Sequence, residues 1–170
     1  MMRVLIAYAT KHYSTAEIAL AIAEELRRFP QLHVDLECVE DVKSLTSYDA
    51  VILGSAVYMG QWRTEAAHFL KQYQHELAQR PVWLFSSGPV GEGDPKTLMK
   101  GWQFPETLQP FADAIKPRDI MLFHGKLETE TLSFLERTAI RVVGASKGDY
   151  RDWNMIRHWT EKISAALAPT

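Results

Sequence analysis

The chain has 170 residues, 46% of them hydrophobic, and its 19 basic and 21 acidic residues nearly cancel. A chain of this length can bury a substantial core, so we expect one globular domain over residues 1–170. The balance of charge argues against a general nucleic-acid binder. It also argues against a strongly acidic carrier that is steered toward basic partners.

Cys38 is the one cysteine of the sequence, so an internal disulfide cannot form and no cysteine cluster suggests a metal centre. This cysteine usage fits a reducing cytoplasm. The N-terminal stretch "MMRVLIAYAT" has no cleavage site of small residues and polar residues follow it at once, which argues against a secretion signal. Because no apolar stretch approaches the roughly 20 residues that cross a bilayer, we expect any membrane contact to be peripheral.

Apolar runs alternate with helical periodicity along the chain. Residues 3–9 form a nearly continuous apolar run, which is typical of a parallel strand covered by helices on both faces. From Ser14 the apolar residues recur at helical spacing, and this helix ends before Pro30. We expect further strands at 32–39, 48–56, 81–87 and 119–127, a helix from about 62 to 78, and a last helix at about 150–167.

Strands that alternate with helices in this way predict a doubly wound parallel sheet with right-handed crossovers. Five strands suit the order 2-1-3-4-5, with helices on both faces of the sheet. Two connections are longer than the topology requires, namely 88–107 and 128–148, and the second is expected to hold an extra short helix.

Ligands of such sheets bind outside the carboxyl ends of the strands, where we expect the loops 10–15, 54–62 and 86–93 to meet. The first loop opens a helix, whose free N–H groups favour an anion such as phosphate. Ser14 adds a hydroxyl group there, as do Thr10 and Thr15. However, Ser14 and Glu17 also fit a capping box, which would satisfy the helix start without any ligand.

The second loop offers Tyr58, Met59 and Trp62, where an aromatic ring can stack on a flat heterocycle. Trp62 equally fits the first core residue of the following helix, and a rim formed by Trp62 and Trp102 fits a substrate entrance, a dimer contact or buried core. The third loop, "SSGPVGEG", consists of small residues that let backbone groups approach a ligand closely. Its Gly and Pro residues also mark an ordinary turn.

In this order and spacing, "YATKHYSTAEIA", "VILGSAVYMGQW" and "WLFSSGPVGEG" resemble the three FMN-binding loops of flavodoxin-domain proteins. The C-terminal "GDYRDWNMIRHWTEKI" is similar to the end of the menaquinone-dependent protoporphyrinogen oxidase branch. The resemblance spans nearly the whole chain and implies a flavodoxin-like α/β fold with FMN as cofactor. It assigns the cofactor contacts to three sets of residues: Thr10, Lys11, His12, Tyr13, Ser14 and Thr15; Tyr58, Met59, Gly60 and Trp62; and Ser86, Ser87, Gly88, Pro89, Val90 and Gly91.

The chain departs from this family at two places. The family usually has glycine where this chain has Tyr13, and a non-glycine residue at positive φ costs roughly 1–2 kcal/mol. Either the loop takes another conformation, or FMN binding is weakened. The segment 128–148 is much shorter than the corresponding insertion of the protoporphyrinogen oxidase.

The remaining polar and charged residues say less about the function. No acid–base pair accompanies the three loops, which suits redox chemistry performed by a cofactor, so no catalytic side chain is assigned. His68 and His75 are expected to be surface histidines rather than a metal pair, since they lie about two helical turns apart. The segment 137–162 is expected to present a solvated basic face, formed by Arg137, Arg141, Lys147, Arg151, Arg157 and Lys162.

Three functions from different classes fit these features. We predict an FMN-dependent oxidoreductase that exchanges electrons with a small conjugated substrate or a quinone. The alternatives are a flavodoxin-type electron carrier that serves a redox protein, and a flavodoxin-like binding or oligomerisation module, such as a homodimer, that has lost FMN.

Overall fold

The computed structural model describes residues 1–127, 133–143 and 148–168. Its main sheet has the strand order β2-β1-β3-β5-β6, and all neighbouring strands in this order are parallel. These strands are β1 (Met2–Ala9), β2 (Leu32–Cys38), β3 (Ala50–Tyr58), β5 (Val82–Ser87) and β6 (Asp119–Phe123). The predicted doubly wound topology is therefore confirmed.

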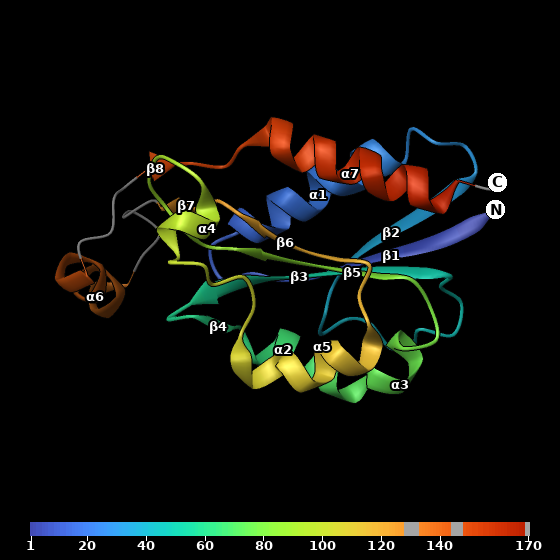
Figure 1. Cartoon of the computed structure of the whole chain (residues 1–170), viewed down its shortest axis with the longest axis horizontal. Helices are drawn as coiled ribbons and strands as arrows, with labels where there is room; N and C mark the ends of the chain where they lie inside the picture. The colour runs from blue at the N-terminus through green and yellow to red at the C-terminus, as the bar shows by residue number, and fades with distance from the viewer. Residues whose placement is uncertain (128–132, 144–147, 169–170) are drawn as a thin grey trace.

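Helices cover both faces of the sheet (Figure 1). One layer consists of α1 (Ser14–Leu26) and α7 (Trp153–Leu167), and the other consists of α2 (Thr64–Gln72), α3 (Gln74–Leu77) and α5 (Gln109–Ile115). The position of β1 between the two helical layers explains why its sequence is almost entirely apolar. Val4 and Ile6 pack into the core beneath α1 and α7, whereas Leu5 and Ala7 pack into the core on the opposite face.

The single helix predicted over 62–78 is wrong at its start and in its middle. Trp62 belongs to a two-residue strand, β4 (Gln61–Trp62), which pairs antiparallel with β3. The helical stretch that follows is interrupted at Tyr73, where φ is −99° and ψ is 18°. Because Phe69, Tyr73 and Leu77 stay buried across the interruption, the apolar pattern predicted the buried face but not the break.

The chain after β6 also differs from the single strand predicted over 119–127. The strand β6 ends at Phe123, and Lys126–Leu127 form β7, which pairs antiparallel with β8 (Gly148–Asp149). The extra helix expected within 128–148 is α6 (Phe134–Val143), while 128–132 and 144–147 lie outside the described residues. The longer connection 88–107 contains α4 (Pro95–Leu98) and the start of the short 3-10 helix Glu106–Leu108.

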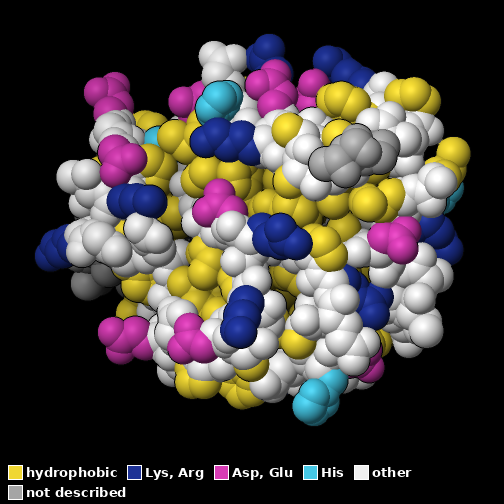
Figure 2. Space-filling model, turned by 45° about the vertical axis from the view of Figure 1, so that its right-hand side comes forward, with side chains coloured by type: hydrophobic (Ala, Val, Ile, Leu, Met, Phe, Trp, Pro, Cys, Tyr) yellow, Lys and Arg dark blue, Asp and Glu magenta, His cyan; other side chains and the backbone are white. Residues whose placement is uncertain are grey.

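The carboxyl ends of the parallel strands lie at the end of the molecule opposite to the two chain termini (Figure 1). The strand β4, the helices α4 and α6, and the β7–β8 pair gather at this end. On the face drawn in Figure 2, acidic and basic side chains are interspersed, with hydrophobic atoms between them. Within the three described ranges, no helix has both the length and the apolar content that a membrane span requires.

Candidate functional site

Two hydroxyl groups in and after the β1–α1 loop are buried without a partner. Thr10 Oγ1 and Ser14 Oγ are inaccessible to solvent, and neither forms a hydrogen bond to the described part of the chain. An unsatisfied buried hydroxyl costs roughly 1–3 kcal/mol. Such a pair at the start of a helix can donate hydrogen bonds to a further polar group or accept them from it.

The capping box predicted from Ser14 and Glu17 is not formed. The N-cap of α1 is Tyr13, and no side chain in the described part of the chain caps the first turn. Glu17 instead accepts a hydrogen bond of 3.1 Å from Arg151 Nη1. No side chain of residues 1–127, 133–143 or 148–168 competes for the first N–H groups of this 13-residue helix. These groups lie beside the Ser14 hydroxyl, an arrangement that anion sites use.

Tyr13 adopts the left-handed conformation, with φ of 64° and ψ of −9°. Of the two outcomes expected for this position, the loop therefore keeps the positive-φ backbone that glycine usually provides. The Tyr13 side chain is 73% exposed, so its ring lies mostly in solvent. The contact between this loop and an anion would rest on the backbone and on the hydroxyl groups.

The second loop is a β-hairpin, which the sequence interpretation missed. Tyr58 pairs with Gln61 across β3 and β4, and the two residues between them, Met59 and Gly60, have φ of 53° and 72°. Two consecutive positive φ values are typical of the type I′ turn, whose twist matches that of the flanking strands. The hairpin presents Tyr58 and Met59 at its tip, where they are 57% and 78% exposed. The signal in the sequence was the Met-Gly pair between strand-like residues.

Trp62 points from the same hairpin into the protein. Only 5% of it is exposed, and its ring meets the ring of Phe104 edge-on at a centroid distance of 5.2 Å. Of the alternatives predicted for Trp62, burial in the core is the one observed. Trp102 lies beside the turn, since a Cβ atom added at Gly60 would be 3.8 Å from its Nε1 atom.

Two adjacent serines at the end of β5 connect the three loops. Ser86 Oγ accepts a hydrogen bond of 2.8 Å from Trp62 Nε1, and Ser87 Oγ accepts one of 3.4 Å from Thr15 Oγ1. Both serines are buried, so their hydroxyl groups serve contacts inside the protein. The three loops predicted to meet at the carboxyl ends of the strands do meet there.

The third loop is held against the end of β6 through its backbone. Gly88 N–H donates to Phe123 O at 3.2 Å, and Gly125 N–H donates to Pro89 O at 2.9 Å. A Cβ atom on Gly125 would lie 2.9 Å from the Gly88 carbonyl oxygen, so this approach requires glycine. Beside this loop opens a pocket of about 510 Å³, lined by Gly91, Gly93, His124 and the start of α7 among others.

Arg151 is the first residue near these loops that the sequence interpretation misplaced, because it was expected on a solvated face. Only 3% of its side chain is exposed, and the guanidinium binds Asp149 at 2.8 Å and Glu17 at 3.1 Å. It also stacks on the Trp153 ring at 4.7 Å from the centroid. The hydrogen bonds from Arg151 lower the pKa of Asp149. Arg151 thereby fixes the first turn of α1 to the β8–α7 corner.

Glu136 is the second missed residue, and it reaches the first loop from α6. Its Oε1 atom lies 3.0 Å from Lys11 Nζ, and its Oε2 atom lies 2.7 Å from His12 Nε2. Burial alone would raise the pKa of this carboxyl, but hydrogen bonds from His12, Lys11 and Ser133 outweigh it and lower the pKa to about 2. A sequence signal existed, since Ser133 and Glu136 have capping-box spacing, but that spacing says nothing of a distant partner.

His68 and His75 are exposed, as predicted. Among the described residues, no group of three or more His, Cys, Asp or Glu side chains is arranged to hold a metal ion. The carboxyl ends of the strands bring together the hydroxyl groups of Thr10 and Ser14, the first turn of α1, the exposed Tyr58 and the glycine-rich third loop.

The chain is similar to known proteins in sequence and in fold. The model of the flavodoxin domain family matches residues 5–154. A search of curated proteins found no match. A short-chain flavodoxin associated with a non-canonical PDU bacterial microcompartment is similar in structure, with 13% identity, a TM-score of 0.62, and coverage of 99% of this chain and 100% of that chain.

Two further solved structures resemble the chain. Oxidised flavodoxin 2 from Bacillus cereus has 25% identity and a TM-score of 0.52, over 76% of this chain and 90% of that chain. The apo form of an NADH:FMN oxidoreductase has 13% identity and a TM-score of 0.59, over 100% of this chain and 92% of that chain. The structures that share this fold thus include both a flavodoxin and an oxidoreductase.

Proposed function

The chain belongs to the flavodoxin domain family, and from that premise we propose that it is an FMN-binding oxidoreductase. The observation that carries this proposal is the pair of buried, unpartnered hydroxyl groups of Thr10 and Ser14 at the start of α1. A phosphate group offers both hydroxyls an acceptor and also accepts hydrogen bonds from the free N–H groups of the helix. The residues present therefore fit the phosphate end of FMN.

Each loop has a separate task in this proposal. Thr10, Ser14 and the N–H groups of 11–15 would hold the phosphate. Tyr58 and Met59 would cover one face of the flavin ring, and the backbone of 88–91 would contact its edge. When bound, the flavin supplies the redox chemistry, whereas the protein binds it, orients it and limits the access of water.

We propose a small conjugated molecule or a quinone as the electron partner, in the reducing cytoplasm that the single Cys38 suggests. The similarity of residues 148–163 to the protoporphyrinogen oxidase branch supports this class of partner. The pocket of about 510 Å³ beside the third loop offers space next to the proposed flavin edge. A flavodoxin-type electron carrier is the second candidate, favoured by the exposed Tyr58 and Met59, which a protein surface can reach.

Cofactor titration of the apoprotein tests the proposal. FMN is expected to bind, with FAD and NAD much weaker, because the first loop has donors for one terminal phosphate and lacks a G-x-G-x-x-G turn. Thr10→Val should weaken FMN binding by about tenfold or more, the effect of one charge-assisted hydrogen bond. The same substitution should leave the stability of the apoprotein unchanged or raised, because it removes an unsatisfied polar atom.

Thr160→Val is the matched control for this experiment. Thr160 is also buried, but its Oγ1 donates to Ile156 O at 2.8 Å, so its loss should destabilise the apoprotein and leave FMN affinity intact. Equal or tighter binding of FAD would overturn the cofactor assignment. A purified protein that stays colourless and binds none of the three cofactors would favour the module without flavin.

A further inference from the structure

We propose that Glu136 competes with the phosphate group of the flavin for the side chains of Lys11 and His12 in the first loop. Glu136 thereby reduces the preference of this chain for FMN over riboflavin, which lacks the phosphate. The inference rests on the proposed function, and it adds a residue that determines specificity and lies outside the three cofactor loops.

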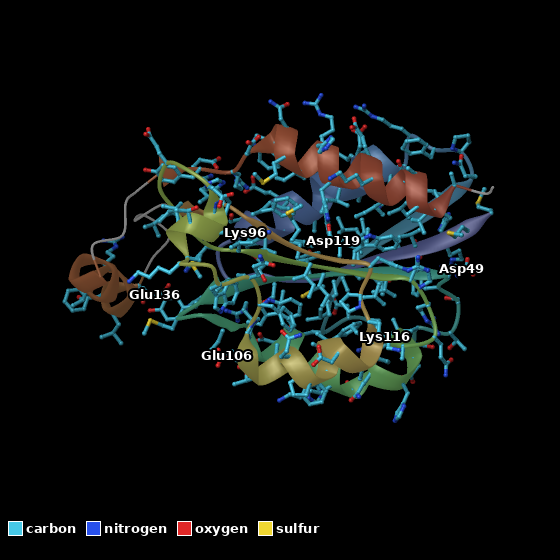
Figure 3. All side chains as sticks on the ribbon, viewed as in Figure 1. Asp49, Lys96, Glu106, Lys116, Asp119 and Glu136 are labelled. Atoms are coloured by element: carbon cyan, nitrogen blue, oxygen red, sulfur yellow. The ribbon has the colours of Figure 1, made fainter. Side chains whose placement is uncertain are left out.

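The geometry places one carboxylate against the side chains of two neighbouring residues of the loop. Glu136 points from α6 toward the carboxyl end of the sheet (Figure 3). Its two oxygens lie 3.0 Å from Lys11 Nζ and 2.7 Å from His12 Nε2, and Ser133 Oγ donates to Oε1 at 3.0 Å. Only 17% of the Glu136 side chain is exposed, so it is more than a solvated surface charge.

Lys11 and His12 differ in the number of hydrogen bonds that they can donate to a second anion. The ammonium group of Lys11 has three donors and can bind two anions at once, whereas His12 Nε2 has a single position for a proton. A phosphate held by the N–H groups of 11–15 would lie beside the same side chains. His12 could then serve either the phosphate or Glu136, and the remaining anion would face a like charge nearby.

Repulsion between the two anions couples phosphate binding to the contact of α6 with the loop. Such coupling is reciprocal. If Glu136 weakens the binding of the phosphate, then the bound phosphate weakens the contacts of Glu136 with Lys11 and His12 to the same extent. Removing the negative charge of Glu136 should therefore improve binding of ligands that carry the phosphate. It should not improve the binding of the flavin ring itself.

The test measures dissociation constants for FMN and riboflavin with the wild-type protein and with Glu136→Gln. The ratio of the riboflavin constant to the FMN constant should rise about fivefold in the variant at low salt. This gain should shrink in about 1 M KCl, where exposed and half-exposed charges are screened. Glu24→Gln is the matched control, because it removes the same charge from an exposed position on α1 and should leave the ratio unchanged.

A second readout uses the apoprotein without any flavin. Inorganic phosphate should raise the melting temperature of Glu136→Gln more than that of the wild-type protein. If Glu136→Gln instead weakens the binding of FMN and of riboflavin alike, Glu136 supports the structure of the cofactor site and the proposed competition is wrong. An unchanged ratio with tight FMN binding to both proteins would also overturn the inference, whereas a wild-type protein that binds neither flavin would overturn the proposed function.

Discussion

The indole Nε1 of Trp62 donates a hydrogen bond of 2.8 Å to Ser86 Oγ, and this bond joins the β3–β4 hairpin to the end of β5. Both residues are buried, so water cannot replace either partner. This side-chain pair adds to the pairing of β3 with β5, which ends at Ala56 and Ser87, in fixing the hairpin relative to the third loop.

Trp62→Phe should lower the free energy of unfolding by about 1–3 kcal/mol, because the variant leaves the Ser86 hydroxyl buried without its donor. Trp62→Ala should lower it by about 3–5 kcal/mol, since a large cavity adds to that loss. Urea unfolding of the apoprotein measures both. Trp153→Phe, at a partly exposed ring, is the control and should change little. A Trp62→Phe variant with unchanged stability but altered FMN affinity would mean that Trp62 contacts the cofactor and not only the core.

Tyr58→Leu should raise the reduction potential of bound FMN by about 20–60 mV. An electron-rich ring against the flavin disfavours the negative charge that reduction adds, and a site with little water strengthens this effect. Potentiometric titration of the holoprotein measures the shift, with Phe29→Leu, between α1 and β2, as a control for loss of an aromatic residue away from the site. Equal potentials in wild type and Tyr58→Leu would mean that the hairpin tip does not cover the flavin.

The order of the sheet and the meeting of three loops were predictable, because both follow from local patterns. The apolar run of β1 needs only its own residues to indicate burial on both faces, and the ends of parallel strands must share one edge. The hairpin at Met59 and Gly60 was harder to predict, since it depends on two backbone angles and not on the spacing of hydrophobic residues.

The electrostatic contacts of the site could not be predicted from one sequence. Glu136 and His12 are 124 positions apart, and Arg151 and Glu17 are 134 apart. Spacing along the chain predicts which side chains share a helix face, but it cannot pair charges that only the fold brings together. For the same reason, the buried Arg151 was assigned to a solvated face by its neighbours in sequence.

Tyr48 should make stability depend on pH at the alkaline end. Burial and the hydrogen bond that its hydroxyl donates to Asp35 raise the pKa of Tyr48 to about 12. Because the folded pKa exceeds the unfolded value of about 10, the protonated hydroxyl stabilises the fold fully below about pH 10. That contribution should be lost progressively as pH rises from about 10 to 12.

The measurement compares the free energy of unfolding of the wild-type protein and Tyr48→Phe between pH 8 and 12. The free energy of unfolding of the wild type should exceed that of Tyr48→Phe by a constant amount near pH 8, and this difference should shrink toward pH 12. Burial also raises the pKa of Tyr8, so absorbance near 295 nm should show a late-ionising component in both proteins, smaller by one tyrosine in the variant. A difference in stability that stays constant to about pH 12 would contradict the assignment.

Tyr13→Gly should stabilise the apoprotein by up to about 1 kcal/mol. Glycine relieves the roughly 1–2 kcal/mol of strain at a φ of 64°, and its greater freedom in the unfolded chain offsets about 0.5–1 kcal/mol of that gain. Glycine also lets a phosphate approach the backbone more closely, so FMN affinity should rise by up to about tenfold. Lys116→Gly is the matched control: Lys116 has a φ of 50° at the end of α5 and lies far from α6 and the first loop (Figure 3). It should show a similar gain in melting temperature with no change in FMN affinity.

Calorimetric titration and thermal unfolding on the same samples separate the effect on FMN affinity from the effect on stability. Weaker FMN binding by Tyr13→Gly would mean that the tyrosine ring or hydroxyl contributes to holding the cofactor.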